Sequence, residues 1–254
     1  MIAGAIGAAI VALAARRMRA LSTSGMVTGT AAGTIAVAAG WSWGILLVAH
    51  FIAASALSKL GERRKSELVG PITEKGDERD ARQVAANGAV YVLAALGYLL
   101  WHSPLTYAVG IGALAASAAD TWATEIGTLA AKNPVSIISG RRVPPGTSGG
   151  VSLAGTLASG GGAVFIAAGA ALARWPVPFT AIVLGGLAGA VADSLLGATL
   201  QDRRWCDACA MATERSVHSC GNVTRRTGGL RGLDNDAVNA VCSAVGALVT
   251  LLLS

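Results

Sequence analysis

Apolar stretches recur along the whole chain, and their length limits the fold more than any other feature of the sequence. Eight of them lie at residues 2–15, 26–40, 42–60, 85–101, 105–131, 151–173, 178–200 and 236–253. A helix that crosses the hydrocarbon layer of a membrane needs about 20 predominantly apolar residues. The composition agrees, because only 13% of the residues are charged, against about 25% in soluble domains. The sequence therefore predicts an all-α fold: one polytopic membrane helix bundle over residues 1–254, with about seven to eight transmembrane helices, the first two short or broken.

The basic residues predict how these helices are oriented. With eight segments, all but one of the 20 Lys and Arg residues fall in loops on the same side, and Arg174 is the exception. By the positive-inside rule this side is cytoplasmic, and both termini lie outside. The same rule explains the net charge of +6, so we expect no nucleic-acid partner. The first apolar run precedes its basic residues, unlike a secretory signal, which favours a multi-pass protein of a prokaryotic plasma membrane.

Two polar loops are expected in the cytoplasm, a basic loop at 61–84 and a Cys- and His-containing loop at 201–231. Arg79, Arg82 and Gln83 in the first loop run directly into the apolar segment that contains Asn87. Guanidinium groups at a membrane surface suit bidentate binding of phosphate. The alternative is an ordinary solvated loop on the positive side.

Three acidic residues, Asp120, Glu125 and Asp193, lie within apolar segments or at their cytoplasmic ends. An ionised side chain at the bilayer centre costs roughly 2.5–3.5 kcal/mol, so such acids usually pair with a cation, a metal or a substrate. Asp120 and Glu125 are about 140° apart around a regular helix. They can converge only if the helix breaks between them or if a metal binds at its end.

Other polar residues mark segment ends, and for these a structural role competes with a functional one. Ser152, Asn235 and Asp236 are as well suited to capping a helix as to binding a ligand. A loop rich in Gly, Ser and Thr covers Thr147, Ser148, Gly149, Gly150 and Ser152, and it leads into an apolar segment. Such a loop can present several backbone N–H groups to an anion.

The loop at 201–231 contains the pattern C-x2-C-x8-H-x-C, formed by Cys206, Cys209, His218 and Cys220. Four nitrogen and sulfur ligands suit a tetrahedral structural zinc ion. Disulfides are rare in the cytoplasm, so the open alternatives are a zinc site and free thiols.

Five motifs in order resemble those of a known family of integral membrane proteins. They are EKGDERDARQVAANG, ADTWATEIG, GTSGGVSLAGT, VADSLLGATLQ and LDNDAVN, and together they extend from about residue 16 to 245. The chain is similar to the family that includes the phytyl-phosphate kinases of plants and cyanobacteria and transmembrane protein 19 of animals. The resemblance implies an enzyme that phosphorylates an isoprenyl monophosphate of the phytyl or geranylgeranyl type, with CTP as the donor in preference to ATP.

That chemistry assigns a role to each polar group. Phosphoryl transfer depends mainly on positioning and charge stabilisation. Mg²⁺ is expected at Asp120, Glu125 and Asp193, since hard cations take oxygen ligands. The residues expected to bind substrate or nucleotide are Lys75, Arg79, Arg82, Gln83, Asn87, Thr147, Ser148, Gly149, Gly150, Ser152, Ser194, Gln201, Asn235, Asp236 and Asn239.

Two other classes of protein remain open. A lipid or anion transporter, or a flippase, also places acids and broken helices within the membrane. Against it, the chain has no obvious inverted repeat, and its polar residues gather toward one face of the membrane. A CTP-dependent cytidylyltransferase that makes a CDP-linked lipid would need the same metal and acids as the kinase.

Overall fold

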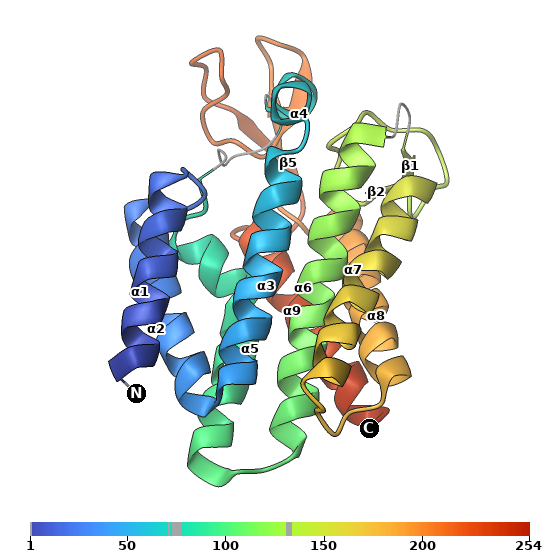
Figure 1. Ribbon diagram of the computed structural model, residues 1–254. Helices are drawn as coiled ribbons and strands as arrows, with labels where there is room; N and C mark the ends of the chain where they lie inside the picture. Colours follow the sequence, from blue (N-terminus) through green and yellow to red (C-terminus); the bar gives the residue numbers. More distant parts are fainter. Residues whose placement is uncertain (1, 71, 73–77, 131–133) are drawn as a thin grey trace.

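The protein is a helix bundle whose long helices alternate in direction (Figure 1). The computed structural model describes residues 2–70, 72, 78–130 and 134–254. Its helices are α1 (Ile2–Arg17), α2 (Thr23–Ala39), α3 (Trp41–Lys59), α4 (Glu62–Val69), α5 (Ala81–Trp101), α6 (Leu105–Ala130), α7 (Leu153–Leu172), α8 (Phe179–Thr199) and α9 (Asn235–Leu252). All eight predicted apolar segments form long helices, and the all-α fold class is confirmed. The short helix α4 lies inside the segment 61–84 that was expected to be a loop.

The two ends of the bundle differ in character. Helix α4 and the small sheets lie at one end, called the polar end below (Figure 1). The short α5–α6 and α7–α8 connections lie at the opposite end, where α1 begins and α9 finishes. This arrangement matches the alternation expected from eight segments.

Five of the described helices, α3, α5, α7, α8 and α9, are long and apolar enough to cross a membrane. Helices α1 and α2 contain only 16 and 17 residues, in keeping with the short segments expected there. At about 1.5 Å per residue, both are shorter than the hydrocarbon layer of about 30 Å. Helix α6 has 26 residues and contains both Asp120 and Glu125.

Polar side chains fix where four of the helices begin. Ser22 caps α2, Ser152 caps α7, and Asp80 forms a reciprocal capping box with Gln83 at the start of α5. The capping role expected of Ser152 is therefore present. At α9 the cap is Asp234, whose carboxylate accepts a hydrogen bond of 3.0 Å from the Ala237 amide. Capping by Asn235 or Asp236 was wrong, because the helix begins at Asn235 and its cap is the residue before it.

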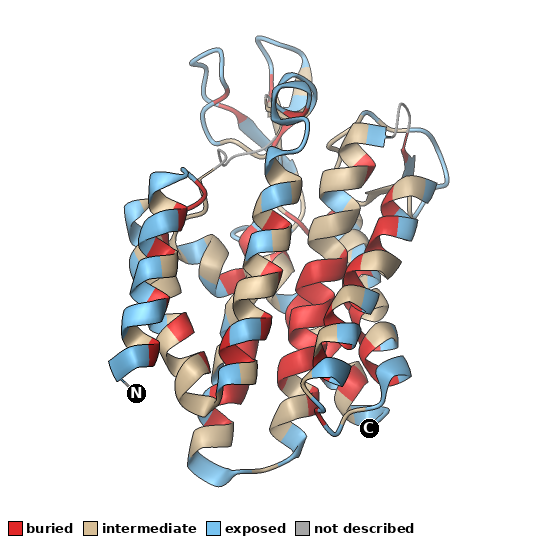
Figure 2. Ribbon diagram, in the orientation of Figure 1, coloured by how far each residue is buried: buried red, intermediate tan, exposed pale blue. Residues whose placement is uncertain are grey.

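Helix α6 is the centre of the bundle, and every residue from Gly110 to Ala119 is buried (Figure 2). Small residues let the neighbouring helices approach it closely. A Cβ atom on Gly162 of α7 would lie 2.6 Å from the Ala118 carbonyl oxygen of α6. The packing at this position therefore requires glycine.

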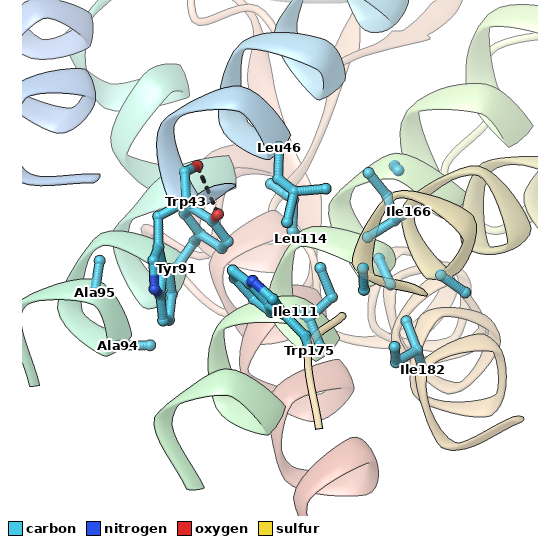
Figure 3. Packing of buried hydrophobic residues seen from close by; sticks show 14 of the residues in the cluster. Trp43, Leu46, Tyr91, Ala94, Ala95, Ile111, Leu114, Ile166, Trp175 and Ile182 are labelled. Atoms are coloured by element: carbon cyan, nitrogen blue, oxygen red, sulfur yellow. Dashed lines mark hydrogen bonds between the residues drawn. The ribbon is translucent and has the colours of Figure 1, made fainter. Parts of the chain in front are cut away.

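Aromatic residues pack together toward the end opposite the polar end. Trp43 of α3 lies at their centre, with its ring centroid 4.5 Å from that of Trp175 and 5.2 Å from that of Tyr91 (Figure 3). The Tyr91 hydroxyl donates a hydrogen bond of 2.7 Å to the Trp43 carbonyl oxygen. Ile111 and Leu114 of α6 belong to the same buried cluster. This end of the bundle is thus filled by side chains, and the polar groups gather at the other end.

Two small antiparallel sheets form within the polar loops. Strands β1 (Val135–Ser136) and β2 (Gly150–Val151) pair just before α7. Strands β3 (Arg203–Cys206), β4 (Met211–Thr213) and β5 (Arg225–Gly228) form a sheet in the order β4-β3-β5. We call residues 203–228 the sheet lobe. None of these strands was expected from the hydropathy pattern, which shows only apolar segments.

Candidate functional site

Two adjoining cavities lie at the polar end of the bundle. The larger has a volume of about 700 Å³, and α6, α8, the Gly-rich loop, the sheet lobe and the start of α9 line it. The smaller, of about 360 Å³, lies among α3, α4, α5 and α6. Their shared wall consists of Val69, Gln83, Asp120, Thr124, Glu125, Thr128 and Asn235. One continuous polar region therefore contains most of the residues singled out in the sequence.

Carboxyl groups from three separate parts of the chain meet in the larger cavity. Asp120 of α6 and Asp193 of α8 lie within hydrogen-bonding reach of each other. Glu214, which follows β4 in the sheet lobe, interacts electrostatically with Asp193. Among the described residues, the Oδ1 atom of Asp193 is buried without a hydrogen-bond partner. A cluster of acids with an unpartnered buried oxygen is chemically suited to hold a divalent cation.

Glu214 was missed in the sequence analysis. Its Oε1 atom accepts hydrogen bonds of 2.9 Å from the Ser148 hydroxyl and 2.7 Å from the Gln201 amide. It therefore ties the sheet lobe to the Gly-rich loop and to the residues after α8. No local pattern marks Glu214, because it lies in a polar loop and meets its partners only when the lobe folds back over the bundle.

Glu125 also lies on the shared wall, but other partners occupy its carboxylate. Lys65 of α4 forms an ion pair of 2.5 Å with Glu125 Oε2, and the Ser58 hydroxyl donates to Oε1. Helix α6 is unbroken from Leu105 to Ala130, so the helix break considered for Asp120 and Glu125 is absent. Glu125 is thus placed beside the cations, while Asp193 and Glu214 are the acids associated with Asp120.

Among the described residues, three cationic side chains line the smaller cavity, namely Lys65, Arg79 and Arg215. The acids Glu62, Asp120 and Glu125 line it too. Arg79 donates hydrogen bonds of 3.0 Å to Ser55 and 3.2 Å to Ser58. Burial lowers the pKa of the Arg79 guanidinium, and the nearby Glu125 carboxylate opposes that shift. Among the described residues, Arg215 Nε is buried without a hydrogen-bond partner. Cationic side chains thus lie beside the acidic larger cavity, and neither Lys65 nor Arg215 was anticipated.

The Gly-rich loop, Thr147–Ser152, lines the larger cavity. Gly149 has a φ of +75°, and a Cβ atom there would lie 2.7 Å from the Ser194 carbonyl oxygen of α8. Only glycine therefore fits both the backbone conformation and the contact with α8. Ser194 lines the same cavity. Thr147 uses its hydroxyl locally, in a hydrogen bond of 2.7 Å to the Pro144 carbonyl oxygen.

Most of the other predicted residues line the cavities. Gln83, Gln201, Asn235, Asp236 and Asn239 each line at least one of the two cavities. Asn87 lines the smaller one, but its side chain bonds to the Gln83 carbonyl oxygen and the Ser117 hydroxyl, at 3.0 and 3.1 Å. Arg82 lines neither cavity, and its guanidinium donates instead to the cap residue Asp234, at 2.8 Å. Lys75 lies outside the described residues.

The four predicted Cys and His residues lie together in the sheet lobe. One donor atom from each of Cys206, Cys209, His218 and Cys220 lies within 4.8 Å of the others. The Cys206 and Cys220 sulfur atoms are 3.7 Å apart, and His218 Nδ1 is 3.2 Å from the Cys220 sulfur. The sequence spacing therefore predicted the spatial cluster correctly.

The family model described as Integral membrane protein DUF92 matches residues 6–247. The chain belongs to this family. The DUF92 match includes both cavities and every long helix at least in part, and it confirms the family resemblance drawn from the five motifs. No solved structure matches the chain.

Relatives similar to this chain come from a plant, a cyanobacterium and an archaeon. Protein PGR of Arabidopsis thaliana is 28% identical over 282 residues, which cover 100% of this chain and 96% of that protein. An uncharacterized membrane protein of Methanocaldococcus jannaschii is 30% identical, over 76% of this chain and 79% of its own. Protein VTE6, chloroplastic, of Arabidopsis thaliana is 27% identical, over 92% of this chain and 65% of its own length.

Proposed function

We propose that this protein is an integral membrane kinase that transfers a phosphoryl group, from CTP, to an isoprenyl monophosphate. The observation that carries the proposal is the shared wall between the acidic larger cavity and the smaller cavity, which is lined by Lys65, Arg79 and Arg215. A phosphoryl-transfer site needs both a metal-binding group of acids and cations for phosphate oxygens. Asp120 and Glu125 of α6 line both cavities, so the two kinds of group lie side by side.

The acid cluster fits a magnesium ion. Asp120, Asp193 and Glu214 would hold it, directly or through water, because Mg²⁺ prefers carboxylate and water oxygens. When bound, the ion would neutralise charge on the phosphates of the donor. The buried Asp193 Oδ1 atom then gains the partner that the described residues do not provide.

The cations of the smaller cavity and the Gly-rich loop would position the phosphates. Arg79 and Arg215 line the smaller cavity, and their guanidinium groups would bind phosphate in a bidentate manner. Thr147 to Ser152 would offer backbone N–H groups to another phosphate at the start of α7. Lys65 would act mainly by holding Glu125, since its ammonium group also donates to the carbonyl oxygens of Leu57 and Ser58, at 2.8 and 2.6 Å.

The reaction requires no strong general base, because the acceptor phosphate is already an anion. One of its oxygens forms a bond to the γ-phosphorus of CTP, and the bond from that phosphorus to the bridging oxygen breaks. The products are the isoprenyl diphosphate and CDP. Leu187 and Val191 of α8 give the larger cavity an apolar side, which suits the first part of a prenyl chain.

The family resemblance supports the choice of CTP and of a prenyl substrate. If the polar end faces the cytoplasm, as the basic loops predict, the site is open to cytoplasmic nucleotides. The prenyl chain would then lie in the same membrane leaflet as the site.

The proposal is tested by incubating the purified protein with geranylgeranyl monophosphate, Mg²⁺ and either CTP or ATP. Mass spectrometry of the products should show geranylgeranyl diphosphate and CDP. Formation of a CDP-linked lipid with pyrophosphate would instead identify a cytidylyltransferase. Absence of turnover with geranylgeranyl and phytyl monophosphates alike would contradict both enzyme functions and favour a transporter.

A further inference from the structure

The Cys and His cluster of the sheet lobe lies outside the acidic cavity, and the proposed kinase chemistry does not use it. Cys206 ends β3, Cys209 lies in the turn that leads to β4, and His218 and Cys220 lie between β4 and β5. The cluster therefore joins all parts of a sheet whose strands contain only three or four residues. So small a sheet has little apolar core of its own and needs additional stabilisation.

The geometry of the cluster is that of a tetrahedral metal site. Two thiolates bound to one zinc ion at about 2.3 Å each are separated by about 3.8 Å. The Cys206 and Cys220 sulfur atoms are 3.7 Å apart, and all four donor atoms lie within 4.8 Å of one another. The cysteines are free, and 3.7 Å is too long for a disulfide, whose sulfur atoms are about 2.05 Å apart.

A hydrogen bond from outside the cluster supports one of the four residues. The Asn222 side-chain amide donates a hydrogen bond of 3.3 Å to the Cys220 sulfur, which would stabilise a bound thiolate. Cys206 and His218 are buried, whereas Cys209 and Cys220 are exposed. The site is thus half covered by the lobe, and its exposed side gives a metal ion access.

We propose that Cys206, Cys209, His218 and Cys220 bind one structural zinc ion, and that this ion holds the sheet lobe in place over the two cavities. The second part follows from where the lobe places its polar residues. Glu214 and Arg215 directly follow β4, and they line the larger and the smaller cavity respectively. Arg215 also donates to the Gly70 carbonyl oxygen, at 3.1 Å, which ties the lobe to the end of α4.

The first test measures metal directly. Full-length protein, purified in detergent and dialysed against metal-free buffer, should contain about one zinc ion per chain by elemental analysis. The variant Cys209→Ser should lose most of this zinc, and because Cys209 is exposed the change should leave the helix bundle intact. Cys242→Ala, which removes a buried thiol of α9, should keep it. Wild-type protein that stays free of zinc after incubation with one equivalent of Zn²⁺ would overturn the proposal, as would a disulfide detected by intact mass.

The second test concerns the lobe, and only its activity readout rests on the proposed function. Trypsin should cut at Arg204, Arg215 or Arg225 much faster in Cys209→Ser than in Cys242→Ala. In the kinase assay, Cys209→Ser should need roughly ten-fold more Mg²⁺ for half-maximal rate. A loosened sheet lobe would displace Glu214, and displaced groups around a metal ion cost about 10- to 100-fold in metal affinity. Unchanged proteolysis would contradict the proposal that the zinc ion holds the sheet lobe in place. Zinc bound without any kinase activity would refute the proposed function and leave the zinc site standing.

Discussion

At the scale of single residues, the carboxylates of the candidate site differ in the groups that they contact. Glu125 is paired with Lys65, whereas Asp120, Asp193 and Glu214 share one cavity. The sequence could show that Asp120 and Asp193 are unusual, because acids are rare in apolar segments. It could not show that Glu214 joins them, because an acid in a polar loop is ordinary and its Ser148 contact spans 66 residues.

The substitution Glu214→Gln tests whether this acid acts through its charge. Glutamine keeps an oxygen that can accept from Ser148 and Gln201, so the thermal stability should change little. The loss of a negative charge near Asp193 should raise the Mg²⁺ concentration for half-maximal activity by roughly ten-fold or more. A Mg²⁺ titration of the kinase rate measures this. An unchanged Mg²⁺ requirement would remove Glu214 from the metal site.

The ion pair between Lys65 and Glu125 gives a second prediction for individual residues. The two side chains are only 10% and 20% exposed, so removing one partner leaves an almost buried charge. Lys65→Met should therefore lower the free energy of unfolding by about 3–5 kcal/mol. The double variant with Glu125→Gln should recover part of that loss, as measured by chemical unfolding in detergent. Additive losses would show that the pair is not coupled.

At the scale of secondary-structure elements, the helices could be predicted and the loop structures could not. Each long helix follows from an apolar stretch, and local residues such as Ser152 and Asp80 fix where helices begin. The strands of the sheet lobe contain only three or four residues, and polar ones are frequent among them. Their pairing depends on contacts across the loop, which leave no periodic signal in the sequence.

Close packing of α6 and α7 predicts how glycine substitutions behave. A Cβ atom on Gly162 would lie 2.6 Å from the Ala118 carbonyl oxygen, so Gly162→Ala should lower the melting temperature by several degrees. Gly160, on the same helix, has open space around it, and Gly160→Ala should be neutral or stabilising by up to about 1 kcal/mol. Thermal unfolding of both variants in detergent compares them directly. Equal effects would contradict the packing described for this helix pair.

At the scale of the whole molecule, the polar end and the opposite, aromatic-filled end predict how the bundle is oriented in the membrane. The basic loops predict that the polar end is cytoplasmic, and α9 finishes at the other end (Figure 1). Alkaline phosphatase fused after Ser254 should therefore be active in bacterial cells, and green fluorescent protein fused there should be dark. A bright fluorescent fusion with inactive phosphatase would reverse the orientation and place the site outside the cell.

The most direct test of the central claim follows the γ-phosphoryl group itself. Purified wild-type protein should transfer label from γ-labelled CTP to geranylgeranyl monophosphate in the presence of Mg²⁺. Asp193→Asn should reduce that rate by more than about 100-fold, because it alters the carboxylate whose Oδ1 atom has no partner in the described part of the protein. Asp207→Asn makes the same chemical change at an exposed residue outside both cavities and should transfer label at the wild-type rate. Wild-type turnover in Asp193→Asn, or no transfer by the wild-type protein, would contradict the proposed active site.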